Sequence, residues 1–169
     1  FRDVTTGEYK PLLATKWKWK DNVTLIVELR TDVKFHDGSA FDAEDVVYTV
    51  NHVANKENGV LTFSNVKYMK NAVKLGSHKV QINLHKPFPA TIAYLAGAVF
   101  MMPKGHYDSA PTKPDGKKDY GSVKANGTGP YKWKETKSGD YVLWEKNANY
   151  FDGAKGKPSI GMVKFRTIK

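Results

Sequence analysis

The sequence predicts an α+β fold, made mostly of antiparallel β-hairpins with helices inserted between them. Three stretches, at residues 15–30, 72–85 and 129–146, alternate apolar and polar side chains around a turn, which is the period of a half-buried strand. Helical periodicity is confined to two short segments that begin at Asp42 and Ala90. The 169 residues contain no internal repeat and no low-complexity tract, so one domain accounts for them.

The first hairpin is predicted at residues 15–30. In the stretch NVTLIVELR, every second residue from Val23 to Leu29 is apolar, and these residues share one face of a strand. The preceding WKWK alternates as well, and Asp21 and Asn22 are residue types that favour a turn. The pattern therefore predicts two paired strands with one buried face.

A helix is predicted to follow, because the next stretch carries the signals of a helix start. Asp42 is a suitable N-cap, and Asp45 stands three residues later, as in a capping box. Phe41 and Val46 have the spacing of a hydrophobic staple. Helix initiation therefore accounts for most of the acidic residues in this stretch.

The same stretch raises the question of a catalytic or metal-binding cluster, since His36 and Asp37 lie in the turn before the helix. We interpret them as structural, because the other histidines show no ligand spacing and the chain has no cysteine. No hydrolase, zinc-protease or phosphate-loop motif is present. We therefore expect no catalytic residue, no metal site and no cofactor.

The middle of the chain is predicted to contain a second hairpin at residues 72–85 and a helix at 90–98. Between them, the prolines of residues 87–89 end the sheet. The apolar run at 99–103 is interpreted as a buried strand or a continuation of the helix. Residues 103–128 are rich in Gly, Pro and Lys and predict a long surface loop with room for one helical turn.

The last part of the chain is predicted to be a third hairpin and a final strand. Residues 129–135 and 140–146 alternate around a turn at 136–139. Aromatic side chains on both strands would give this hairpin one apolar face. The final strand is predicted at residues 160–167.

The net charge of the chain is +10 and its isoelectric point is about 9.6. Such a balance fits a nucleic acid partner, an anionic membrane surface or a soluble lysine-rich surface. The lysines are spread along the sequence, and the longest cluster, at 113–118, is broken by three other residues, which is typical of a solvated loop. No apolar run approaches the ~20 residues that a membrane-spanning helix needs.

Three blocks of the sequence resemble one protein family. They are LATKWKWKDNVTLIVELRTDVKFHDGSAFDAEDVVYTV, HKVQINLHKPFPATIAYLA and NGTGPYKWKETKSGDYVLWEKNANYFDGAKGKPSIGMVKFRTI. In this order they resemble the family 5 extracellular solute-binding proteins, the dipeptide, oligopeptide and nickel receptors of ABC importers. Each block is weakly specific by itself, but the three in family order cover most of the chain.

The resemblance implies a type II, cluster C periplasmic-binding-protein fold. Residues 1–169 would be a single domain, forming part of lobe I (subdomain Ib). Family members are longer and have two lobes, so the second lobe is expected to be absent from this chain. The start at Phe1, without an initiator methionine or a signal region, leads to the same expectation of a fragment.

The resemblance also implies a function. The protein would be the extracytoplasmic substrate-binding component of an ABC importer, periplasmic or at the cell surface. It would capture a peptide or similar small solute between two lobes and deliver it to the permease subunits. It would be no enzyme, bind no nucleic acid, and act as a monomer peripheral to the membrane. The substrate stays open among peptides, opines, nickel chelates and oligosaccharides.

Rough alignment with the family implies six residues at the solute cleft, which are Thr62, Phe63, Phe100, Met101, Thr128 and Gly129. The first four follow the two predicted helices, and the last two form a turn before the third hairpin. The alternative for the apolar residues is a place in the core. The alternative for Gly129 is a turn that needs unusual backbone angles before Pro130.

Two other classes of function stay open from the sequence. A basic α+β nucleic-acid-binding or protein-interaction module would use the positive charge and the aromatic side chains of a sheet. No RNA-binding or DNA-binding motif accompanies that composition. A carboxylate-dependent hydrolase would use Asp37, Asp42, Glu44 or Asp45, most of which helix capping already explains.

Overall fold

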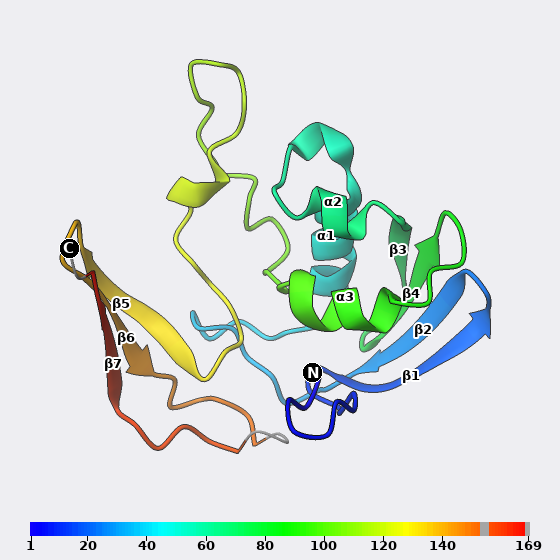
Figure 1. Ribbon diagram of the computed structural model, residues 1–169, viewed down its shortest axis with the longest axis horizontal. Coiled ribbons are helices and arrows are strands. Elements are labelled where there is room, and N and C mark those ends of the chain that lie inside the picture. The colour runs from blue at the N-terminus through cyan, green and yellow to red at the C-terminus, as the bar shows by residue number, and fades with distance from the viewer. Residues whose placement is uncertain (153–155, 168–169) are drawn as a thin grey trace.

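Two antiparallel β-sheets organise the chain, as Figure 1 shows for this computed structural model. The structure describes residues 1–152 and 156–167, so residues 153–155 and 168–169 of the predicted single domain lie outside the described part. The first sheet has the strand order β1–β2–β4–β3 and the second has the order β5–β6–β7. The strands are β1 (Ala14–Asp21), β2 (Thr24–Leu29), β3 (Met69–Gly76), β4 (Lys79–Leu84), β5 (Tyr131–Lys137), β6 (Tyr141–Lys146) and β7 (Met162–Arg166).

The helices lie on one face of the first sheet (Figure 1). They are α1 (Ala43–Ala54), α2 (Phe63–Val66) and α3 (Thr91–Ala98), with 3₁₀ turns η1 (Lys56–Asn58) and η2 (Tyr120–Ser122). None of the helices in the described part is long and apolar enough to cross a membrane. This mixture of helices and antiparallel sheets confirms the predicted α+β class.

The three predicted hairpins are all present, and the register between the first two builds one apolar face. Strand β2 pairs with β4 so that Leu25 lies opposite Ile82 and Val27 lies opposite Val80. Cross-strand partners point to the same side of a sheet, so the apolar sets of both hairpins coincide. The shared register thus creates the surface on which α1 packs.

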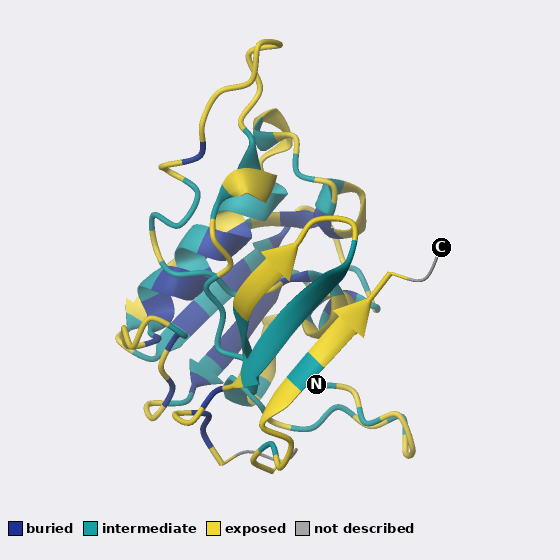
Figure 2. Ribbon diagram, turned by 90° about the vertical axis from the view of Figure 1, so that its left-hand side faces the viewer, coloured by how far each residue is buried: buried dark blue, intermediate teal, exposed yellow. Residues whose placement is uncertain are grey.

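The core lies between that face and the helices. Phe35 and Phe41, from the loop before α1, are each under 3% exposed and meet edge to face at 5.9 Å. Burial of a large apolar side chain contributes about 1.5–3 kcal/mol, so these two rings together contribute about 3–6 kcal/mol to stability. Figure 2 shows that the buried residues gather in the first sheet and its helices, whereas no residue of β5, β6 or β7 is buried.

Two residues after β6 connect the second sheet to this core. Tyr150 and Phe151 are 5% and 6% exposed and belong to the same buried cluster. The guanidinium group of Arg30, just beyond β2, lies 4.7 Å above the ring centre of Phe151. The chain therefore returns from the second sheet to the first before it forms β7.

The start of α1 confirms the predicted capping box. The carboxylate of Asp42 accepts a hydrogen bond from the backbone N–H of Glu44 at 2.6 Å, and that of Asp45 accepts one from the N–H of Asp42 at 2.8 Å. Asp45 also accepts a bond from the N–H of Lys104 at 2.8 Å. Burial raises the pKa of Asp45. One carboxylate therefore caps the helix and holds the start of the long loop.

The prediction for residues 99–103 was wrong, because α3 ends at Ala98 and no strand follows. The hydroxyl of Thr49 on α1 donates to the carbonyl of Met102 at 3.2 Å and accepts from its N–H at 3.0 Å. A side chain of the neighbouring helix thus satisfies the backbone groups that a strand partner would otherwise bind. The long loop at 103–128 with one helical turn, η2, is confirmed.

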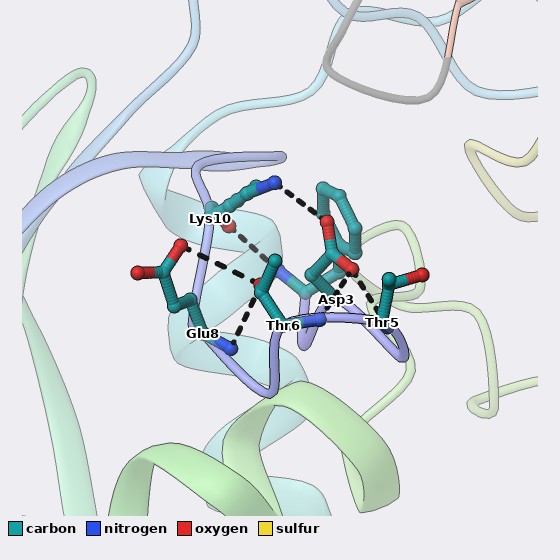
Figure 3. A network of polar contacts seen from close by, with 6 residues as sticks. Asp3, Thr5, Thr6, Glu8 and Lys10 are labelled. Atoms are coloured by element: carbon teal, nitrogen blue, oxygen red, sulfur yellow. Dashed lines mark hydrogen bonds and ion pairs between the residues drawn. The ribbon is translucent and has the colours of Figure 1, made fainter.

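The first ten residues form a closed turn that the sequence did not reveal (Figure 3). The carboxylate of Asp3 accepts hydrogen bonds from the N–H groups of Thr5 and Thr6 at 2.9 and 3.2 Å. The ammonium group of Lys10 lies 2.6 Å from the same carboxylate. These contacts, that with Lys10 foremost, lower the pKa of Asp3 to about 2. The segment is folded back before β1 begins.

Replacing the helix cap tests the described start of α1. We expect Asp42→Ala to lower the free energy of unfolding by about 1 kcal/mol, because the N–H groups of the first turn lose their acceptor. Urea unfolding followed by circular dichroism measures the change. Glu57→Ala is the matched control, since Glu57 is exposed. Equal stability of the Asp42→Ala variant and the wild type would contradict the capping assignment.

Candidate ligand-binding surface

His36 fastens the loop before α1 to the turn that leads into β5. Its ring nitrogen Nδ1 accepts from the N–H of Gly127 at 3.4 Å, so the proton lies on Nε2, which donates to the carbonyl of Gly129 at 3.1 Å. The backbone N–H of His36 also donates to the carbonyl of Gly127 at 2.9 Å. Burial lowers the pKa of His36 and thereby favours this neutral form. We call this arrangement the His36 clasp.

Neighbouring polar side chains extend the His36 clasp. The amide of Asn126 donates to the carboxylate of Asp37 at 2.7 Å, and the hydroxyl of Ser39 donates to the same carboxylate at 2.7 Å. These bonds, that from Ser39 foremost, lower the pKa of Asp37. The amide of Asn147 donates to the carbonyl of Gly129 at 3.0 Å. The carboxylate of Asp37 and the ring of His36 thus hold the segments of the clasp together.

The predicted need for unusual backbone angles at Gly129 was wrong. Gly129 is absent from the glycines with positive φ among the described residues, and a Cβ built there would have its closest contact at 3.7 Å. Its carbonyl is what matters, because it accepts bonds from both His36 and Asn147. Thr128 and Gly129 therefore lie in the clasp.

A polar hollow of about 760 Å³ opens beside the His36 clasp, between the long loop and the second sheet. The ammonium groups of Lys132 and Lys134 lie 3.2 and 3.7 Å from the carboxylate of Glu145. That of Lys124 lies 5.5 Å from the ring centre of Trp133. The hollow is therefore lined by charges of both signs. No group of three or more potential metal-ligating side chains occurs in residues 1–152 and 156–167.

The long loop is held against α1 by an aromatic stack. The ring of His52 stacks on Tyr107 with centroids 4.7 Å apart and meets Tyr120 edge to face at 5.0 Å. The hydroxyl of Tyr48 donates to Asp108 at 3.1 Å and accepts from the N–H of Tyr107 at 2.9 Å. The loop therefore forms one fixed wall of the hollow.

Four of the predicted cleft residues lie around α2 and α3, two helices that pack against each other. In Figure 1 the chain enters α2 and leaves α3 on the side of the long loop. Thr62 and Phe63 at the start of α2 are half-buried, and Met101 packs against the core. Phe100 is 69% exposed, so the core position considered for it was wrong.

The sequence missed one neighbour of these residues. Leu61, directly before Thr62, is 99% exposed, which is a costly place for a large apolar side chain. The only signal for it was an apolar residue in a short connection between two helices. No hydrogen bond or ring contact in the described part of the chain joins Thr128 or Gly129 to the other four predicted residues. The six predicted residues therefore form two groups.

The chain matches a family model described as "Bacterial extracellular solute-binding proteins, family 5 Middle" over residues 8–169. The chain belongs to this family. The match confirms the family resemblance carried by the three sequence blocks, and it covers all the strands and helices described above.

Among curated members of family 5, the chain is 28% identical over 142 residues to the oligopeptide-binding protein AppA of Bacillus subtilis, covering 84% of this chain and 26% of that protein. It is 28% identical over 151 residues to the glutathione-binding protein GsiB of Pectobacterium atrosepticum, covering 88% of this chain and 27% of that protein. These relatives are named as binding proteins.

Solved structures of family 5 members share the fold. NikZ from Campylobacter jejuni, solved with Ni(L-His), has a TM-score of 0.81 and 29% identity, and the alignment covers 96% of this chain and 31% of NikZ. AppA from Bacillus subtilis, solved with a nonapeptide, has a TM-score of 0.80 and 28% identity, covering 93% of this chain and 31% of AppA. The chain thus spans between a quarter and a third of the relatives that it matches.

Loss of the clasp histidine is expected to destabilise the protein and to reduce the amount of stability that it loses when the pH falls. His36→Ala removes two hydrogen bonds and should lower the free energy of unfolding by about 1–3 kcal/mol at pH 7.5. Because burial lowers the pKa of His36 below 6.5, its contribution is complete above pH 6.5 and is lost as the pH falls through and below that value.

Urea unfolding at pH 7.5 and pH 5 measures both effects. Burial also lowers the pKa of His52 and His106, so wild-type stability should fall towards pH 5, and the fall should be smaller in His36→Ala. His85→Ala, at an exposed position, is the control and should change neither value. An unchanged pH dependence in His36→Ala would show that the clasp does not hold a neutral histidine.

Proposed function

We propose that this chain is part of the substrate-binding component of a bacterial ABC importer. In this proposal residues 1–169 contribute part of lobe I, and the solute is captured between this lobe and a second one. The support is membership of family 5 together with coverage of only about a third of the structurally similar proteins. A peptide or a similar small solute is the proposed ligand, since relatives are named for oligopeptide and glutathione binding.

The observation that carries the proposal is the exposed apolar surface at the predicted cleft residues. Leu61, which precedes the predicted pair Thr62–Phe63, is 99% exposed, and Phe100, which forms a predicted pair with Met101, is 69% exposed. Ligand sites are concave and mostly apolar, with a few polar groups that orient the ligand. An apolar wall that faces solvent in one lobe fits a cleft that closes when the other lobe arrives.

The remaining features of the proposal are those that the family resemblance implies. The protein acts outside the cytoplasm, as a monomer peripheral to the membrane, and delivers its solute to permease subunits. It performs no reaction, so binding affinity and closure of the lobes carry its function. A nucleic-acid partner is not proposed, because the lysines are spread along the chain and no recognition motif accompanies them.

Binding measurements on the full-length protein test the proposed cleft. We expect calorimetric titration with peptides of two to five residues, glutathione or a nickel–histidine chelate to identify a ligand with a Kd of about 1 μM or lower. Phe100→Ala should weaken that affinity by about 10- to 100-fold, because the ligand loses an apolar contact worth about 1.5–3 kcal/mol.

Val4→Ala is the matched control, because Val4 is also 99% exposed but lies in the turn before β1. Its affinity should equal that of the wild type. If both Phe100→Ala and Leu61→Ala bind as tightly as the wild type, the apolar surface is no part of the cleft.

The 169-residue chain by itself provides a second test. We expect it to fold and to bind the same ligand at least about 100-fold more weakly than the full-length protein, because one wall of the cleft is missing. Calorimetric titration of both proteins under the same conditions measures the ratio. Equal affinity of the short and full-length proteins would contradict the division of the cleft between two lobes.

A further inference from the structure

The outer face of the first sheet carries a row of lysines on its edge strand β1. The register places Lys16 opposite Glu28 and Lys18 opposite Ile26, on the side away from α1. Lys20 follows at the bulge before the β1–β2 turn. All three lysines are exposed, and none forms an ion pair or side-chain hydrogen bond within the described residues. The charges of Lys16 and Lys18 are therefore uncompensated by short-range partners, whereas Lys20 has the carboxylate of Asp21 beside it.

The rest of this face contributes little opposing charge. The carboxylate of Glu28 lies 3.4 Å from the ammonium group of Lys79, which neutralises it. Towards β3 the face carries uncharged amide side chains. The amide of Gln81 donates a hydrogen bond to that of Asn83 at 2.8 Å, and the amide of Asn83 donates one to that of Asn71 at 2.7 Å. The one remaining acid nearby, Asp21, lies in the turn, where its carboxylate accepts from the N–H of Val23 at 2.9 Å.

The face is shallow, and apolar groups lie at its floor and margins. Ile26 is 8% exposed and floors a hollow of about 520 Å³ that Lys16 and Lys18 border. At the margin of the face on β3, Val73, which lies opposite Gln81, and the nearby Leu75 are 38% and 49% exposed. The face has lysines along one side and exposed apolar groups at its edge. Because it is shallow, it suits a broad, flat partner better than a small molecule.

We propose that this face of the sheet rests on an anionic phospholipid surface. Lysines near such a surface attract it without needing a fixed geometry. Every cation on this face is a lysine, and only three of the 27 basic residues of the chain are arginines. Arginine is the residue that protein–protein and base-specific contacts prefer, whereas lysine is depleted from protein interfaces.

The contact would be weak and reversible. Each lysine near an anionic membrane strengthens binding by about fivefold, so three lysines together supply about 100-fold. This affinity is enough to orient a protein that approaches the membrane, and it leaves α2, α3 and Phe100 on the opposite side of the sheet free. The proposal is independent of which solute the protein binds.

Vesicle binding by the full-length protein, produced without any lipid modification, tests the proposal. Co-sedimentation uses vesicles with 30 mol% phosphatidylglycerol in phosphatidylcholine, and vesicles of phosphatidylcholine only, at low salt. We expect binding to the anionic vesicles alone, weakened by added salt because counterions screen the lysines. Replacing Lys16, Lys18 and Lys20 by glutamine should weaken binding by about 100-fold.

The matched control replaces Lys56, Lys117 and Lys157 by glutamine, which removes the same charge from exposed positions elsewhere. Its binding should fall by less than threefold. Equal losses in the two triple variants, or no binding of the wild type to anionic vesicles, would overturn the proposal. Circular dichroism and solute binding, expected to be unchanged in both variants, show that the fold is intact.

Two further outcomes would assign the lysines differently. Binding of soluble poly-glutamate that depends on the three lysines, without vesicle binding, would indicate an acidic protein segment as the partner and overturn the lipid assignment. Self-association of the glutamine variant with unchanged vesicle binding would show that the lysines protect an exposed strand edge instead.

Discussion

The imidazole ring of His36 is the contact on which the arrangement of the two sheets depends. It joins a loop of the first sheet to the turn that starts the second, and it uses both ring nitrogens to do so. Asn147 binds the same carbonyl from the other end of the β5–β6 hairpin. A neutral histidine is required, because a protonated ring would lose its acceptor. The clasp also lines the hollow that opens between the long loop and the second sheet.

The acidic residues that resemble a catalytic cluster in the sequence each bind backbone or side-chain donors in the fold. Asp42 and Asp45 cap α1, Asp45 also anchors the long loop, and Asp37 closes the turn beside the clasp. Each carboxylate is occupied by donors from its surroundings, so its charge is used to hold backbone in place. The long loop is held in a similar way. The hydroxyl of Tyr48 donates to Asp108, and the ring of His52 stacks on Tyr107.

The exposure of apolar side chains differs between parts of the chain. The first sheet and its helices bury a continuous cluster, whereas the second sheet has no buried residue and Phe165 of β7 is 61% exposed. Leu61 and Phe100, at the proposed solute cleft, are exposed as well. A polypeptide that spans about a third of its relatives is expected to leave such surfaces open.

The sequence by itself determined the hairpins, the cap of α1, the long loop and the family, because these rest on alternation, local hydrogen bonding and recurring motifs. Tertiary structure decided the rest. The pairing of β2 with β4 and the clasp of His36 join residues far apart in the chain, and no local pattern encodes such contacts. The segment at 99–103 was misjudged for the same reason, since Thr49 from another helix satisfies its backbone. Whether Phe100 is buried or exposed likewise depends on which elements surround it.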